Sequence, residues 1–96
     1  DLIKIDVEGA EIDVVNGMDN ILKKNKPILI IELVSGLQTN RNLSTKDFKH
    51  MMSEKYDYNP YMINNNGEIV KVAIEYEHLS DNVVFIHSED KLNNKI

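Results

Sequence analysis

The stretch DLIKIDVEGAE, residues 1–11, decides the fold. Four of its first seven residues are aliphatic, three of these are β-branched, and Lys4 interrupts the apolar run. A nearly continuous apolar run is typical of a strand that is covered on both faces, as in a parallel sheet. Gly9 then allows a tight turn out of the strand. The stretch therefore predicts a buried strand over residues 1–7 that leads directly into a helix.

The following residues complete a strand–helix–strand unit. Residues 10–24 carry apolar side chains with a helical period, at Val14, Val15, Met18, Ile21 and Leu22. Gly17 lies in the middle of this helix, where it either weakens the helix or marks a close packing contact. Pro27 ends the helix, and residues 27–34 (PILIIELV) predict a second buried strand. Such a unit places its two strands parallel, with a right-handed crossover.

The rest of the chain predicts one more helix and three antiparallel strands. Ser44 or Thr45 caps a helix that runs to about Tyr56. The turn Asn64-Asn-Asn-Gly67 joins two strands over residues 58–63 and 68–72, and residues 82–87 form a last buried strand. We expect an α/β fold with one sheet over residues 1–87, parallel at its start and antiparallel at its end. Residues 88–96 form a polar C-terminal tail.

Composition excludes several classes of function. The net charge is −5, whereas nucleic-acid-binding surfaces and proteins that adhere to anionic membranes are basic. The chain has no cysteine, and no apolar run approaches the length that spans a bilayer, so we expect neither a disulfide nor a membrane span. Nothing resembles a secretory leader, and we expect a cytoplasmic location.

Acidic residues cluster where the predicted strands end. Asp6 and Glu8 end the first strand, and Glu32 lies near the end of the second. Ligands of open α/β sheets bind outside the carboxyl ends of the strands, and neighbouring strands are only about 4.8 Å apart. The three carboxylates could hold a hard cation, act as a general base or bind hydroxyl groups. A helix N-cap explains Asp6 or Glu8 equally well.

The remaining polar residues have plainer interpretations. Glu11 fits a favourable charge in the first turn of the helix. Lys4 either lies on a partly exposed strand face or pairs with a carboxylate such as Glu32, and we favour the pairing. The three histidines, His50, His78 and His87, are scattered without metal-ligand spacing, and we expect no functional role for them. The chain contains no Gly-x-Gly-x-x-Gly and no Walker A stretch.

The opening stretch resembles the C-terminal half of the FkbM-type methyltransferases. The resemblance rests on IKIDVEGAE, on the helix containing VVNGMDNIL and on the strand KPILIIEL. It is weaker over YMINNNGEIV and NVVFIH, and it extends over most of residues 1–87. It implies a Rossmann-like class I methyltransferase sheet of seven strands whose final strand is antiparallel. This chain would begin at the fourth strand, and the glycine-rich cofactor loop would lie in a half that the chain lacks.

The resemblance also implies a function and roles for the acidic residues. It implies S-adenosylmethionine-dependent O-methylation of a hydroxyl group on a glycan or a small natural product. Asp6 and Glu8 would be the catalytic residues, and Gly9 would let the backbone approach the cofactor. Lys4, Glu11 and Glu32 would bind the acceptor.

Several alternatives remain open beside this interpretation. Binding of a divalent metal by the carboxylates is our second choice, after their direct role toward the acceptor, because spacing alone does not indicate coordination. The chain could be a non-catalytic binding or scaffold module that retains the half-fold, or, less well supported, a carboxylate–metal hydrolase. Taken alone, the chain would be inactive. Its first strand would be an exposed edge, which invites self-association.

Overall fold

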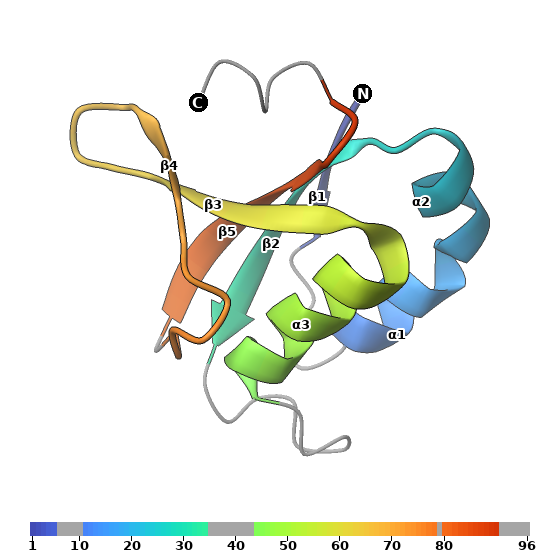
Figure 1. Cartoon of the computed structure of the whole chain (residues 1–96), viewed down its shortest axis with the longest axis horizontal. Helices are drawn as coiled ribbons and strands as arrows, with labels where there is room; N and C mark the ends of the chain where they lie inside the picture. The colour runs from blue at the N-terminus through green and yellow to red at the C-terminus, as the bar shows by residue number, and fades with distance from the viewer. Residues whose placement is uncertain (6–10, 35–43, 79, 91–96) are drawn as a thin grey trace.

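The computed structural model describes residues 1–5, 11–34, 44–78 and 80–90, with the backbone alone at Glu11 and Ile12. Within them, helices pack on one face of a single sheet (Figure 1). The elements in chain order are β1 (Leu2–Ile5), α1 (Glu11–Gly17), α2 (Asp19–Lys24), β2 (Ile28–Val34), α3 (Thr45–Tyr56), β3 (Tyr58–Ile63), β4 (Ile69–Lys71) and β5 (Ser80–His87).

The strand order of the sheet is β1-β2-β5-β3-β4. β1 pairs parallel with β2, and the pairs β2–β5, β5–β3 and β3–β4 are all antiparallel. Because β5 runs antiparallel to both of its neighbours, β2 and β3 point in the same direction on either side of it. The predicted α/β sheet with a parallel start and an antiparallel end is confirmed, and β1 is an edge strand within the described residues.

Side chains alternate along β2 between two apolar layers. Leu29, Ile31 and Leu33 pack with the helices in the main core, on what we call the helix face. Ile28 and Ile30 point to the other side, which we call the open face, where they pack with Tyr61, Val84, Ile86 and Ile69. Burial on both sides explains why the sequence of β2 is apolar without alternation.

The single helix predicted over residues 10–24 is wrong: two short helices, α1 and α2, meet at Met18. The N–H of Met18 bonds both to Val14 O, at 3.1 Å, and to Val15 O, at 3.0 Å, so the helical hydrogen-bond pattern shifts here. Gly17, a weak helix former, lies directly before the break. A Cβ built at Gly17 would meet no atom within 4 Å, so close packing does not explain this glycine.

The sequence signals for the helix cap, the hairpin turn and the last strand predicted the later elements to within two residues. Ser44 caps α3, since its hydroxyl accepts a hydrogen bond from the Asp47 N–H at 3.0 Å. Gly67 has a φ of 80°, which explains the glycine at the end of the predicted hairpin turn. β5 begins at Ser80, two residues before the predicted start, because residues 80 and 81 pair with Val34 and Leu33. Within the described part of the chain, no helix is long and apolar enough to cross a membrane.

Candidate functional site

The predicted catalytic centre is described only in part. Asp6, Glu8 and Gly9 lie outside the described residues, so their predicted roles stay predictions. Glu11 begins α1, whose Val15 packs on the helix face. Lys4 and Glu32 are described, and their positions define the side of the sheet on which a site could form.

Lys4 and Glu32 share the open face. Lys4 pairs in register with Ile30, and Glu32 follows Ile30 by two residues, so all three side chains point to the same side. Lys4 is exposed, and among the described residues no ion pair joins it to Glu32. The exposure of Lys4 agrees with the exposed-face alternative, and pairing with Asp6 or Glu8 lies outside the described residues.

Two rows of side chains cross the open face at the carboxyl ends of β1 and β2. The inner row runs from Lys4 through Ile30 to Val84, and in the outer row Glu32 lies opposite Asn82. Here a carboxylate, an amide and an ammonium group surround an apolar patch. Such a surface can hydrogen-bond the hydroxyl groups of a ligand while contacting its carbon atoms.

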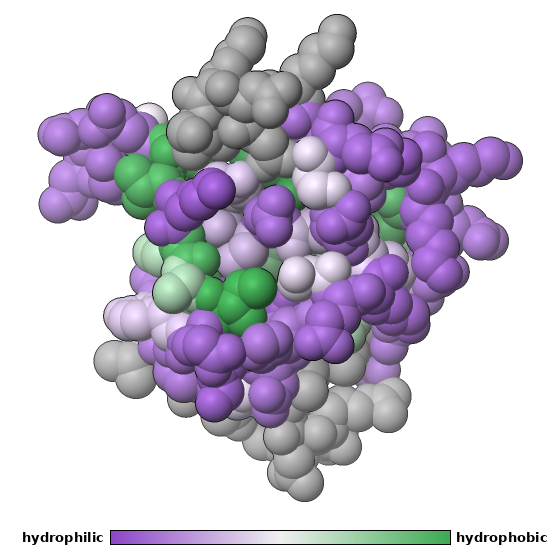
Figure 2. All heavy atoms as spheres, viewed as in Figure 1, coloured by the Kyte–Doolittle hydropathy of each residue, from purple (hydrophilic) through white to green (hydrophobic). Residues whose placement is uncertain are grey.

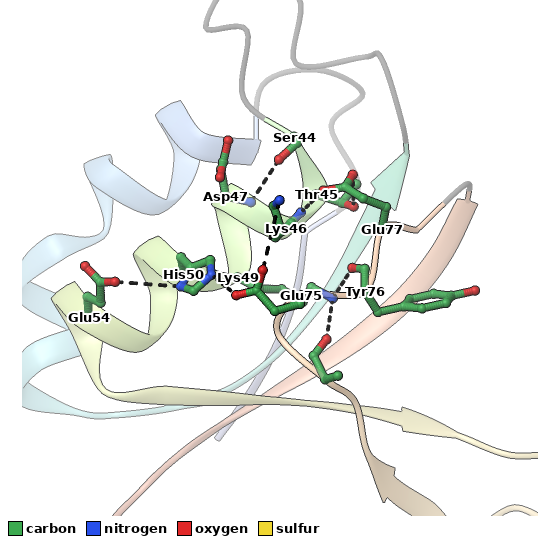
Figure 3. Close-up of polar contacts among 11 residues, drawn as sticks. Ser44, Thr45, Lys46, Asp47, Lys49, His50, Glu54, Glu75, Tyr76 and Glu77 are labelled. Carbon is green, nitrogen blue, oxygen red and sulfur yellow. Dashed lines mark hydrogen bonds and ion pairs between the residues drawn. The ribbon is translucent and has the colours of Figure 1, made fainter.

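A second polar cluster lies on the helix face at the same edge of the sheet, where α3 begins, β2 ends and β5 starts (Figure 1). Its centre is Lys49, whose side chain is completely buried. The Lys49 Nζ donates to Ala73 O at 2.9 Å and to Tyr76 O at 2.6 Å, so it ties α3 to the segment that follows β4 (Figure 3). Burial lowers the pKa of Lys49, against the opposing effect of Glu77, Glu75 and Asp81.

The third partner of Lys49 is His78, which is also completely buried. The Lys49 Nζ lies 2.8 Å from His78 Nε2, and His78 Nδ1 lies 2.8 Å from Asp81 Oδ2. Since an ammonium group has only donors, Nε2 accepts and the imidazole proton is on Nδ1, where it is donated to Asp81. The three side chains form a continuous hydrogen-bonded chain from α3 to the second residue of β5.

Glu77 extends this cluster to the N-terminus of α3. Its carboxylate accepts hydrogen bonds from the Thr45 hydroxyl, at 3.0 Å, and from the Lys46 N–H, at 3.1 Å (Figure 3). Partial burial raises the pKa of Glu77, but these hydrogen bonds outweigh that effect and the pKa lies below its usual value. The contact with Lys46 satisfies one N–H group that a helix N-terminus leaves free, and the contact with Thr45 ties the same carboxylate to the start of α3, so both are structural in character.

Sequence reasoning missed this cluster. His78 was expected to have no role, and Lys49 was not singled out. One signal was available: Lys49 lies between Phe48 and Met52 on the apolar stripe of the predicted helix, and a lysine there requires a buried partner. Within the described residues, no group of three or more histidine, aspartate or glutamate side chains could hold a metal ion.

Comparison with known proteins adds one finding. A family model of the methyltransferase FkbM domain matches residues 1–60, from β1 to the third residue of β3. No curated protein and no solved structure matches the chain. The match includes β1, β2 and the two helices between them. It therefore includes Lys4, Ile30 and Glu32, which are the residues that these two strands contribute to the open-face rows.

Proposed function

This chain belongs to the FkbM methyltransferase family, and we propose that it forms the acceptor side of an S-adenosylmethionine-dependent O-methyltransferase. The acceptor would be a hydroxyl group on a glycan or a small natural product. The activity would belong to a longer protein in which this chain is the C-terminal part of a Rossmann-like sheet. The antiparallel β5 between the like-directed β2 and β3 supports that assignment, because the family's sheet is expected to end in an antiparallel strand.

The observation that carries the proposal is the shared position of Lys4 and Glu32. Both side chains point to the open face at the carboxyl ends of two parallel strands, which is where open α/β sheets bind ligands. Asp6 directly follows β1 in the sequence and stays our candidate for the catalytic residue.

The described residues do not by themselves fit the cofactor. A Cβ added at either described glycine, Gly17 or Gly67, would meet nothing within 4 Å, so neither marks a place where the backbone closely approaches another group. We propose that Gly9 serves this purpose together with residues outside this chain. When bound, S-adenosylmethionine supplies an electrophilic methyl group.

The proposed residues act on the acceptor hydroxyl group. In O-methylation the acceptor oxygen would replace the sulfonium sulfur on the methyl carbon, so that the S–C bond breaks as the O–C bond forms, and the hydroxyl group would give up its proton. Asp6 would accept that proton or orient the hydroxyl, with Glu8 beside it. Glu32 would accept a hydrogen bond from a second hydroxyl, and Lys4 and Glu11 would bind other polar groups of the acceptor. Holding the oxygen in line with the methyl group supplies much of the rate enhancement.

The experiment is a methyl-transfer assay with the full-length protein. Radiolabelled S-adenosylmethionine is offered with a panel of hydroxylated glycans and natural products, and a matched panel of amines serves as the control. We expect label in the hydroxylated acceptors. Transfer to amines alone would refute O-methylation. Acceptor binding without any transfer would favour a binding module that retains the half-fold.

A further inference from the structure

Residues 73–78 lie between β4 and β5 and pack against α3 as neither a helix nor a strand, and we call them the β4–β5 connection. Most of these residues are exposed. In the view of Figure 2, the described hydrophobic residues gather along β3, β4 and this segment, and most of the remaining described surface is hydrophilic. Within the described residues no strand pairing includes the connection, so its contacts with α3 hold it in place.

Two side chains in the first half of α3 make the buried part of this contact. The Thr45 hydroxyl accepts a hydrogen bond from the His78 N–H at 2.8 Å and donates to Glu77 at 3.0 Å. The Lys49 Nζ donates to two carbonyl groups of the connection and to His78 Nε2. The backbone and the side chain of His78 are therefore both bonded to α3, and movement of the connection away from this helix must break both contacts.

Both ring nitrogens of the buried His78 are engaged. Nδ1 donates to Asp81, Nε2 accepts from the Lys49 ammonium group, and the ring of Tyr76 packs against the imidazole with centroids 4.9 Å apart. Nε2 is therefore the only ring atom that an additional proton can occupy. A proton there would turn the acceptor into a donor that faces another donor 2.8 Å away, and it would place two positive charges side by side in a buried site.

Acidic groups near the pair do not remove this conflict. Asp81 stabilises positive charge on His78, but it meets the ring at Nδ1, where a proton is already present. Glu77 and Glu75 of the connection act on Lys49 at longer range, through their charge, and both are exposed. Keeping the contact would require Lys49 to give up a proton in exchange. The closed pair therefore binds no additional proton.

A second histidine lies at the exposed edge of the same interface and should respond to acid in the opposite way. His50 of α3 contacts Glu75 through Nε2 at 2.6 Å and Glu54 through Nδ1 at 3.7 Å, and Lys46 lies 4.0 Å from Glu75. Protonation of His50 strengthens its contacts with two carboxylates, so it tightens the connection on α3. An acid-induced release of the connection must therefore come from His78.

We propose that the contact between Lys49 and His78 makes the β4–β5 connection acid-sensitive: α3 holds it at neutral pH and releases it when His78 Nε2 takes up a proton. An exposed histidine binds its proton near pH 6.5, and the opened connection exposes this ring. Because the open form binds a proton that the closed form does not, the closed form loses stability as the pH falls below that value. This inference needs neither cofactor nor methyl transfer.

Amide hydrogen exchange followed by NMR measures the opening. The His78 N–H is bonded to Thr45 and exchanges only when the connection leaves α3. Its rate, divided by the rate of an unstructured peptide at the same pH, should rise about tenfold between pH 7.5 and pH 5.5. At both pH values this ratio should exceed that of Leu29 in β2, because release leaves the sheet intact. A ratio that is independent of pH, or equal to that of Leu29, would overturn the proposal.

Two matched variants assign the effect to one histidine. His78→Gln keeps an acceptor oxygen for Lys49 but cannot take up the proton, so the rise should disappear. His50→Gln removes the exposed histidine of the same interface and should keep the rise. An undiminished rise in His78→Gln would overturn the proposal.

The wild-type chain decides the question if His78→Gln does not fold. The imidazole nitrogen signals of His78 report directly on the proton at Nε2. We expect Nε2 to become protonated only together with the loss of protection at the His78 amide. A protonated Nε2 in a chain whose His78 amide stays protected would overturn the proposal.

Discussion

The Lys49 Nζ lies 2.8 Å from His78 Nε2, and both side chains are completely buried. This contact joins the first half of α3 to the residues before β5, which are 29 positions later in the chain. A buried ammonium group is stable only where each of its donors is satisfied, and Ala73 O and Tyr76 O complete the set. The start of β5 therefore depends on a residue in α3.

Replacing Lys49 tests this dependence. Lys49→Met keeps most of the aliphatic stem but leaves His78 Nε2 and two carbonyl groups without their donor, and it should lower the free energy of unfolding by about 2–4 kcal/mol. Lys71→Met, on the exposed side of β4, should change it by less than about 0.5 kcal/mol. Urea denaturation of both variants measures the difference. Equal stability of the two would show that the buried contact contributes nothing.

Tyr58 should make the stability fall at alkaline pH. Its side chain is completely buried, its hydroxyl donates to Pro27 O at 2.6 Å, and burial raises its pKa to about 12 from the usual value of 10. Between these values the unfolded chain has lost this proton and the folded chain keeps it, so stability decreases as pH rises through the window. The stabilisation of wild type over Tyr58→Phe should shrink by about 2 kcal/mol, since one pKa unit corresponds to about 1.4 kcal/mol.

Denaturant titrations of both proteins at pH 9 and near pH 12 give this difference directly. All other ionisable groups are present in both proteins, so their effects cancel in the difference. A difference that stays constant with pH would mean that Tyr58 ionises as easily in the folded chain as in the unfolded one.

The two described glycines should respond oppositely to substitution. Gly17 has open space at its Cβ position and no positive φ, so Gly17→Ala should stabilise the chain by about 0.5–1 kcal/mol and extend helix across Met18. Gly67 has a φ of 80°, so Gly67→Ala should destabilise the hairpin by about 1 kcal/mol. Thermal unfolding followed by circular dichroism measures both. Destabilisation by Gly17→Ala would show that the break between α1 and α2 is required.

The elements that local chemistry specifies were predicted from the sequence. The cap at Ser44 or Thr45, the Gly67 turn and the apolar run of β2 were all predicted from local signals, and the structure assigns the cap to Ser44. The break at Met18 was not predicted, because the apolar period continues from α1 into α2 and only Gly17 interrupts it. Periodicity indicates which face is buried, and it does not report where the hydrogen-bond pattern shifts.

The candidate site was harder to predict, since it depends on contacts between distant segments. The shared face of Lys4 and Glu32 follows from the register of β1 and β2, which sequence alone did not fix. Lys49 and His78 come into contact only because the folded chain places the segment after β4 against α3. Pairing between β3 and β5 stops at Tyr61 and Val84, and the sequence of neither strand marks that position.

The chain alone should not bind S-adenosylmethionine measurably. Its described glycines form no cradle, and its sequence contains no glycine-rich phosphate or dinucleotide motif. Isothermal titration calorimetry should give no binding heat for the chain and a clear isotherm for the full-length protein. Tight binding to the 96-residue chain would contradict the division of the site between two halves.

The methyl-transfer rate of full-length protein carrying Asp6→Asn tests the central claim most directly. The matched control is Asp47→Asn, which changes an aspartate in the first turn of α3 and not at the ends of β1 and β2. If Asp6 activates or orients the acceptor hydroxyl, the rate should fall by about 100-fold or more, with thermal unfolding unchanged and the control fully active. A wild-type rate in Asp6→Asn would contradict the claim and assign Asp6 to capping the helix that follows it.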